Sequence, residues 1–204
     1  MYMKELDLLK KDWKKSEASF EQVSEKEIYA MIHKKSSSIV KWILIVSILE
    51  FVVLNGIGLL LPEDHSNEFN DKFDFYINIL EIFSYGITIY FVFLFFKNYK
   101  SISVISSTKE LAESILKTRK TVKYYIRYNI SYIILIMLSF VAYTIYTDFI
   151  TKNDFSSEMT IAIVGLLFLS VIIIALMWGF YQLIYGFLLK KLKKNYEELQ
   201  KIDL

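Results

Sequence analysis

The stretch KWILIVSILEFVVLNGIGLLLP, residues 41–62, decides the fold class of this chain. Residues 42–61 are apolar apart from Ser47, Glu50 and Asn55. At about 1.5 Å per helical residue, a segment of this length covers the roughly 30 Å hydrocarbon core of a bilayer. Pro62 ends the helix because its ring and its missing N–H cannot continue one. The stretch therefore predicts a membrane span.

Three further apolar runs follow, and the composition agrees with them. The chain is 54% hydrophobic, above the roughly 45–50% apolar share of ordinary soluble proteins. We expect an all-α integral membrane protein, a bundle of four transmembrane helices. The predicted spans are residues 42–61, 75–96, 128–147 and 160–189.

The hydrophilic parts complete the predicted domain division. Residues 1–38 form a short helical cytosolic segment, and residues 190–204 form a cytosolic tail. The membrane domain, residues 39–189, contains a basic cytosolic connector at 97–127. Ser24 and Glu27 have the capping-box spacing of a helix start. Whether that helix continues into the first span is left open, because the serines at 36–38 weaken helix propensity.

The distribution of basic residues predicts the topology. Lys and Arg number nine in residues 1–41, one in 62–74, eight in 97–127, one in 148–159 and five in 190–204. The positive-inside rule places both termini and the connector in the cytoplasm. The frequent Ile, Lys, Phe, Tyr and Asn are typical of an AT-rich bacterial genome. We therefore expect a multi-pass protein of the bacterial cytoplasmic membrane.

Several classes of function are excluded by what the chain lacks. It has no cysteine and two histidines, which excludes disulfides, iron–sulfur clusters and multi-histidine metal centres. No serine has a histidine or lysine positioned to activate it, so there is no case for a hydrolase. A net charge of +2 does not suggest nucleic acid as a partner. We expect a protein that is not an enzyme and holds no cofactor.

Two carboxylates interrupt the spans. Glu50 lies about 12 Å from the cytoplasmic edge of the first span, and Glu81 about 9 Å from the outer edge of the second. Charges at such depth are costly, so these residues tend to face the bundle interior and to mark function. We predict a hydrogen-bonded polar seam between spans one and two, made of Glu50, Asn55, Asn78, Glu81, Tyr85 and Thr88.

The seam allows two main interpretations. No Lys, Arg or His lies within a span, so desolvation favours the neutral form of at least one carboxyl group. The first interpretation is a pair of neutral acids that hold the helices together by hydrogen bonds, at about 1 kcal/mol each. The second is a relay for protons or cations, and a ligand contact is a third possibility.

A second set of residues lies on one face of the fourth span. Ala175, Gly179, Gln182 and Gly186 recur at i, i+4, i+7 and i+11. The small residues let another helix backbone approach closely. We expect this face to pack within the monomer, with a homo-oligomer interface as the alternative.

The N-terminal segment predicts a docking surface. Tyr2, Leu6, Leu9 and Trp13 lie on one face of an amphipathic helix. Leu6, Leu9 and Trp13, together with Ile28 and Ile32 of the next helix, are the predicted contacts for a cytosolic protein partner. The alternatives are an anchor on the membrane surface and packing against the chain's own cytosolic part.

The pattern LDLLKKDWKK at residues 6–15, followed by VSEKEIYAMIHKKSSSIVKWI at 23–43, resembles small uncharacterised bacterial membrane proteins. The resemblance implies a short helical cytosolic leader followed by about four transmembrane helices. In layout the chain also resembles membrane anti-sigma regulators, which hold a partner with an N-terminal cytosolic segment. The zinc-binding His and Cys residues of many such regulators are absent.

We therefore expect a non-enzymatic, membrane-embedded adaptor or regulatory protein with a cytosolic docking segment and the lipid bilayer as its surroundings. The alternative is a subunit of a small proton- or cation-coupled transporter or channel that uses Glu50 and Glu81.

Overall fold

The fold is a bundle of long helices. The computed structural model describes residues 10, 24–60, 71–105, 107–152 and 157–201, and the regular secondary structure in these ranges is helical. Each of the four long helices is long and apolar enough to cross a membrane, which confirms the predicted all-helical fold with four candidate spans. They are α2 (Glu25–Leu60), α3 (Asp71–Val104), α4 (Thr108–Lys152) and α5 (Ser157–Gln200).

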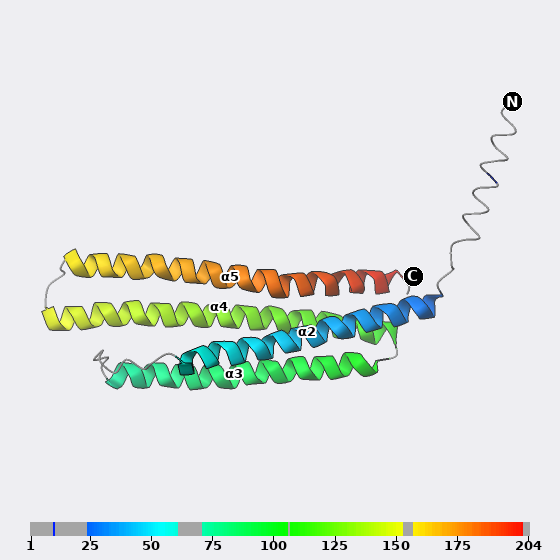
Figure 1. Ribbon diagram of the computed structural model, residues 1–204, viewed down its shortest axis with the longest axis horizontal. Helices are drawn as coiled ribbons and strands as arrows, with labels where there is room; N and C mark the ends of the chain where they lie inside the picture. The colour runs from blue at the N-terminus through cyan, green and yellow to red at the C-terminus, as the bar shows by residue number, and fades with distance from the viewer. Residues whose placement is uncertain (1–9, 11–23, 61–70, 106, 153–156, 202–204) are drawn as a thin grey trace, which may run out of the picture.

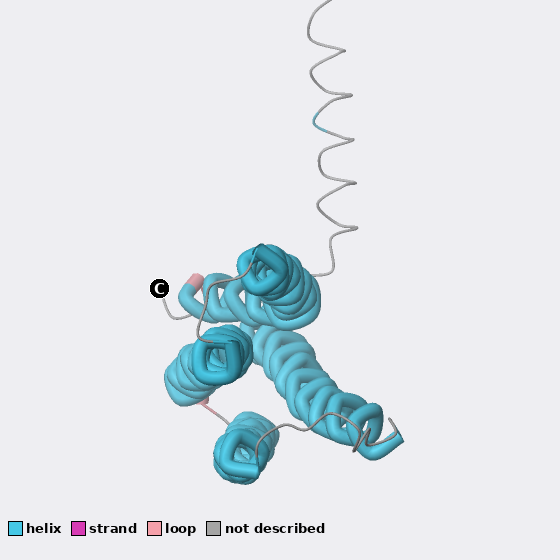
Figure 2. The backbone as a smooth tube through the Cα atoms, turned by 90° about the vertical axis from the view of Figure 1, so that its left-hand side faces the viewer, coloured by secondary structure: helices cyan, strands magenta, loops and turns pink. Residues whose placement is uncertain are grey.

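The helices alternate in direction and form a ring. Along the ring α2 contacts α3, α3 contacts α4, α4 contacts α5, and α5 returns to α2. Figure 1 shows them lying side by side along the long axis of the molecule. In Figure 2, α2 is inclined to the other three helices, and its C-terminal end lies away from α4 and α5.

The helices extend well beyond the predicted spans. Helix α2 runs from Glu25 through Ser36 without a break, and α4 begins at Thr108, about twenty residues before the predicted third span. The predicted connector at 97–127 is thus largely the end of α3 and the first turns of α4. Ser36 is fully buried and accepts a hydrogen bond from Asn195 Nδ2 at 2.9 Å. This contact with α5 outweighs the weak helix propensity of the serines.

Buried residues recur at alternating intervals of four and three. This spacing is typical of left-handed bundles in which neighbouring helices cross at about 20°. Polar residues occupy some of these positions, so the interior is not uniformly apolar. On α4 the buried series is Leu111, Ile115, Thr118, Val122 and Tyr125, and on α2 it is Ser36, Val40, Ile43, Ser47 and Glu50.

The best-packed part of the bundle lies at one end. We call it the lysine-rich end, and it comprises residues 24–41, 97–127 and 190–201. Its buried side chains join one apolar core that continues towards the middle of the bundle. The helices therefore remain a packed bundle beyond the predicted spans. The core residues in this part are Ile32, Ile39, Val40, Ile102, Leu111, Ile115, Val122, Tyr125, Leu192 and Leu199.

Side chains of α2 bind the C-terminal end of α3. The hydroxyl of Tyr29 donates to the carbonyl of Ile105 at 3.1 Å, and Nε2 of His33 donates to the carbonyl of Ile102 at 2.7 Å. Carbonyls in the last turn of a helix lack partners within that helix. The bond to Ile102 satisfies such a group, and the bond to Ile105 holds the residue that follows α3, so together they fix α2 against α3 at the lysine-rich end.

The start of α2 confirms the predicted capping box. The backbone N–H of Ser24 donates to Glu27 Oε2 at 2.9 Å, and the backbone N–H of Glu27 donates to Ser24 Oγ at 3.3 Å. These reciprocal bonds satisfy two backbone donors at the helix N-terminus.

The docking prediction needs a correction for two of its five residues. Ile32 is 2% exposed and belongs to the core, and Ile28 is partly buried against the same core. Neither can form the centre of a partner-binding face, because these side chains already pack in or against the core. Leu6, Leu9 and Trp13 lie outside the described residues.

Candidate functional site

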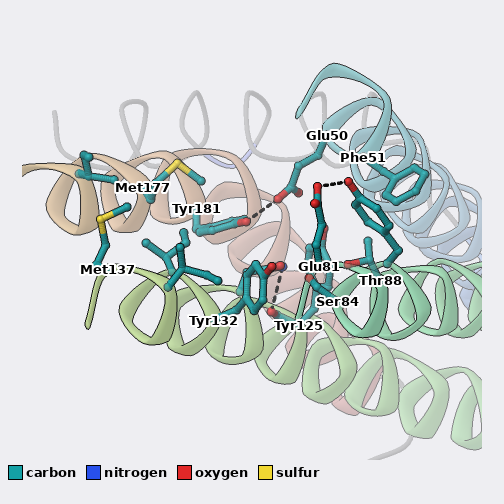
Figure 3. A pocket seen from close by; sticks show the side chains of 15 residues that line it. Glu50, Phe51, Glu81, Ser84, Thr88, Tyr125, Tyr132, Met137, Met177 and Tyr181 are labelled. Atoms are coloured by element: carbon teal, nitrogen blue, oxygen red, sulfur yellow. Dashed lines mark hydrogen bonds between the residues drawn. The ribbon is translucent and has the colours of Figure 1, made fainter. Parts of the chain in front are cut away.

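A cavity with both polar and apolar lining residues lies between the four helices, at the point where α2 moves away from α4 and α5. Its volume is about 380 Å³. Every helix contributes polar side chains to its lining (Figure 3). They are Glu50 from α2, Glu81, Ser84, Tyr85 and Thr88 from α3, Tyr125, Asn129 and Tyr132 from α4, and Tyr181 from α5.

Glu50 is held by two tyrosines of α5. The residue is only 9% exposed, and its carboxyl group accepts hydrogen bonds from the hydroxyls of Tyr181 and Tyr185, the latter at 3.0 Å. The two tyrosine rings lie 5.9 Å apart, and the ring of Tyr125 lies 5.8 Å from that of Tyr185. All three tyrosines are buried. The surroundings thus fix the orientation of the Glu50 carboxyl group before any ligand arrives.

Glu81 occupies the open side of the same cavity. It accepts a hydrogen bond from Tyr85, one turn further along α3, and it is exposed in the isolated chain. The Tyr85 ring packs edge-on against Phe51 of α2, with centroids 6.1 Å apart. Figure 3 shows Glu50 and Glu81 pointing into the cavity from α2 and α3. The two carboxyl groups therefore share one space but have different surroundings.

The cavity is closed towards the lysine-rich end. The next buried layer in that direction contains Ile43 of α2, Phe95 of α3, Val122 of α4 and Tyr185 of α5, none of which is exposed. These side chains belong to the apolar core. A ligand in the cavity would therefore meet packed side chains between itself and the lysine-rich end.

The predicted polar seam is partly gathered in this cavity. Glu50, Glu81, Tyr85 and Thr88 line it, whereas Asn78 is exposed and is not among the lining residues. Asn55 lies in α2, but its side chain is outside the described part of the structure.

The predicted pairing of spans one and two is wrong for Glu50. Its hydrogen bonds run to Tyr181 and Tyr185 of α5 and not to α3. The reason is the ring order of the helices, in which α2 contacts α5 as well as α3. A period along one helix shows which residues share a face, but it does not show which neighbouring helix that face meets.

Sequence reasoning missed most of the aromatic lining. Tyr125, Asn129 and Tyr132 lie at i, i+4 and i+7 on α4, and Tyr181 and Tyr185 lie at i and i+4 on α5. These periods place each set on one face. The chain has 15 tyrosines, and tyrosine is common at membrane interfaces. This spacing alone therefore did not distinguish the tyrosines that line the cavity from the others.

The face of α5 that carries the small residues does not pack closely within the chain. Ala175 is exposed, and a Cβ added at Gly179 would meet no atom within 4 Å. The atoms nearest to a Cβ at Gly186 would be those of the Gln182 side chain on the same helix, the closest at 3.3 Å. The expected internal packing is therefore wrong, because α5 uses another face, with Tyr181, Tyr185 and Leu192, against its neighbours.

Comparisons with known proteins identify a family but no function. No curated protein and no solved structure matches the chain. A family model matches residues 26–204, which cover nearly all of α2 and the whole of α3, α4 and α5. The matched region includes the cavity and excludes the predicted docking residues Leu6, Leu9 and Trp13. The chain belongs to the family described as Domain of unknown function (DUF8845).

Proposed function

We propose that this protein is a membrane-embedded regulatory protein whose cavity binds a proton or a small cation. In this proposal it lies in the bacterial cytoplasmic membrane with both termini in the cytoplasm, as the distribution of basic residues predicts. One observation supports this proposal most strongly. The cavity is closed towards the lysine-rich end, while all four helices continue unbroken into that end.

The cavity lining supports the class of ligand. The described residues that form it provide two carboxyl groups, several hydroxyls and the amide of Asn129, and they include no Lys, Arg or His. Oxygen ligands of this kind suit hard cations and exchangeable protons. A volume of about 380 Å³ admits a small cation with some of its water, since a water molecule occupies about 30 Å³ in the liquid.

The packing supports transmission from the cavity to the lysine-rich end. Glu50 belongs to the same buried series of α2 as Ser36, which contacts Asn195 of α5. Fourteen residues of helix separate them, or about 21 Å. Packed helices shift as rigid elements with discrete arrangements. A change in the Glu50–Tyr181 contact would therefore reach the cytosolic end through α2 and α5.

The docking segment completes the proposal. In the predicted topology, Leu6, Leu9 and Trp13 precede α2 on the cytoplasmic side. A protein partner bound there would lie next to the packed lysine-rich end, where the state of the bundle can be detected. Ile28 and Ile32 are no longer part of the proposed docking surface, because Ile32 lies in the core and Ile28 packs against it.

A transporter is the second candidate, and the pair of carboxyl groups favours it. Glu50 and Glu81 line one cavity, and Glu50 is buried whereas Glu81 is exposed, as in a pathway for protons. Transport requires the layer of Ile43, Phe95 and Val122 to open. Binding without transport does not require this opening, so flux separates the two candidates.

The deciding experiment combines a conformational signal with a flux measurement. The chain has no cysteine, so Glu113→Cys on α4 carries a single bimane label at the lysine-rich end. We expect its fluorescence in lipid nanodiscs to change between pH 8 and pH 5, and to lose this change in Glu50→Gln/Glu81→Gln. Asp74→Asn is the control carboxylate, since it lies outside the cavity lining.

The flux measurement uses proteoliposomes with an enclosed pH dye. A regulatory protein leaves the internal pH unchanged after an external pH jump. Acidification that disappears in Glu50→Gln/Glu81→Gln would instead establish the transporter. A bimane signal that responds neither to pH nor to added Na⁺ or K⁺, together with no flux, would contradict both candidates.

A further inference from the structure

A second concave site lies between α4 and α5, at the lysine-rich end and apart from the cavity. Its volume is about 390 Å³. Five of its lining residues are cationic, and the described lining contains no carboxylate. We call it the basic groove. Its cationic residues are Arg119, Lys123 and Arg127 of α4 with Lys190 and Lys193 of α5, and its other residues are Ile126, Gln182, Gly186 and Leu189.

The register of the two helices concentrates the charge. Arg119, Lys123 and Arg127 are spaced at i, i+4 and i+8, which places them on one face of α4. Like charges at this spacing are unfavourable on an isolated helix. Because α4 and α5 are antiparallel neighbours, Lys190 and Lys193 add to the same field. An anion bound in the groove would relieve this repulsion.

The cationic side chains of the groove have hydrogen-bond donors without partners among the described residues. Nε of Arg119 is buried without a hydrogen-bond partner among the described residues. Within the same ranges, Arg119, Lys123, Arg127 and Lys190 form no ion pair. Lys193 contacts Glu197 at 3.3 Å, but this pair is exposed and contributes little. Phosphate oxygens match the planar guanidinium fork and accept from lysines as well.

The position of the groove indicates the source of the phosphate. Arg127 and Lys190 flank the predicted membrane boundary, while Gln182 and Gly186 lie inside the predicted fourth span. Towards the membrane the same face of α5 continues with Gly179, where an added Cβ would meet no atom within 4 Å. Basic pockets between helices on the cytoplasmic side suit lipid head groups.

We propose that the basic groove binds the phosphodiester of an anionic phospholipid, with an acyl chain along the Gly179 face of α5. Arg119 and Arg127 bind the phosphate oxygens, and Lys190 and Lys193 neutralise the remaining charge. Gly186 keeps the floor of the groove open, because a side chain there would crowd the Gln182 side chain. This site rests on the membrane orientation given in the proposed function but not on ligand binding in the cavity, since its residues and those of the cavity do not overlap.

Native mass spectrometry of the full chain in a mild neutral detergent tests the site. The probes are phosphatidylglycerol, phosphatidylcholine and inorganic phosphate. We expect one phosphatidylglycerol to be retained at concentrations where phosphatidylcholine is not. Inorganic phosphate at the same concentration should leave that lipid bound. Displacement by phosphate, or equal retention of both lipids, would overturn the proposal.

A matched pair of double variants separates the groove from general surface charge. Lys190→Gln/Lys193→Gln removes two charges that line the groove, and Lys191→Gln/Lys194→Gln removes two that do not. The first should weaken phosphatidylglycerol binding by about tenfold or more, and the second by less than about twofold. Equal losses would show that only the net charge matters, and this would contradict a defined site.

A third variant leaves every charge in place. Gly186→Leu fills the floor of the groove and displaces Gln182, so it should weaken phosphatidylglycerol binding as strongly as the lysine pair. Circular dichroism and thermal unfolding report whether each variant is folded. Wild-type lipid binding by a folded Gly186→Leu protein would contradict the proposed position of the lipid.

Discussion

At the scale of single residues, burial and exposure distinguish the two carboxyl groups within the candidate membrane spans. Glu50 is enclosed by tyrosines from α5, whereas Glu81 contacts a tyrosine of its own helix and is exposed. Sequence reasoning found both because a carboxylate in an apolar span is conspicuous. It did not find Tyr181 or Tyr185, because their role depends on which helix lies opposite Glu50.

Replacement of the two glutamates should therefore affect stability differently. Glu50→Ala leaves two buried tyrosine hydroxyls without their acceptor, and each such group costs about 1–3 kcal/mol. Glu81→Ala removes a single bond on the open side of the cavity. We expect Glu50→Ala to lower the free energy of unfolding by at least about 1 kcal/mol more than Glu81→Ala does. Thermal unfolding in one detergent measures the difference, and equal effects would show that the tyrosine contacts contribute little.

The capping box makes the stability of the first turn of α2 depend on pH. The backbone N–H and the hydroxyl of Ser24 bind the Glu27 carboxylate and hold its pKa below the usual glutamate value. A lowered pKa means that the contribution to stability is present above the unfolded pKa, near 4.3, and is lost as the pH falls through the folded pKa.

Hydrogen exchange at the first-turn amides of α2 measures this effect. Their protection should be constant at pH 5 and above and should fall on further acidification. Ser24→Ala removes both side-chain bonds of Ser24 and should reduce protection already at neutral pH. Protection that is the same in Ser24→Ala and the wild type would show that the capping box does not stabilise the turn.

At the scale of helices, periodicity predicted which elements exist but not how far they extend. The four apolar runs predicted the four helices that are long and apolar enough to cross a membrane, since about twenty apolar residues are a strong signal. The extension of α4 down to Thr108 and of α5 up to Gln200 depends on mutual packing of charged, amphipathic segments. Such packing is a property of the assembled bundle, and hydropathy along one segment does not report it.

Two adjacent residues of α4 test whether the segment before the predicted third span belongs to the folded core. Ile115 is fully buried, and its neighbour Leu116 is 41% exposed. Ile115→Ala should cost about 2–5 kcal/mol of unfolding free energy through lost burial and a residual cavity. Leu116→Ala should cost about 0.5 kcal/mol or less. Chemical or thermal unfolding measures the stability of both variants. Equal stabilities would contradict a packed core at the lysine-rich end.

At the scale of the whole molecule, one bundle has two differently packed halves. The lysine-rich half has an apolar core, while the other half widens around the cavity as α2 moves away. Charge counting along the sequence predicted the direction of the bundle in the membrane. The ring order of the helices, and so the cavity itself, could not be derived from it, because several ring orders satisfy the same alternating topology.

Single cysteines test the predicted direction, since the chain has none of its own. Lys26→Cys and Glu113→Cys lie at the lysine-rich end, and Ser157→Cys lies at the opposite end. In intact cells a membrane-impermeant maleimide should label Ser157→Cys alone, and all three after permeabilisation. Labelling of Lys26→Cys or Glu113→Cys in intact cells would reverse or refute the topology.

The most direct test of the regulatory proposal is a distance at the lysine-rich end, measured as the cavity is protonated. Spin labels at Lys26→Cys on α2 and Glu113→Cys on α4, in nanodiscs, report this distance by pulsed electron paramagnetic resonance at pH 8 and pH 5. The Glu27 cap stays ionised over this range because Ser24 lowers its pKa. We predict a shift of the distance distribution that disappears in Glu50→Gln/Glu81→Gln. The same distribution at both pH values, or a shift that persists in the variant, would contradict transmission from the cavity.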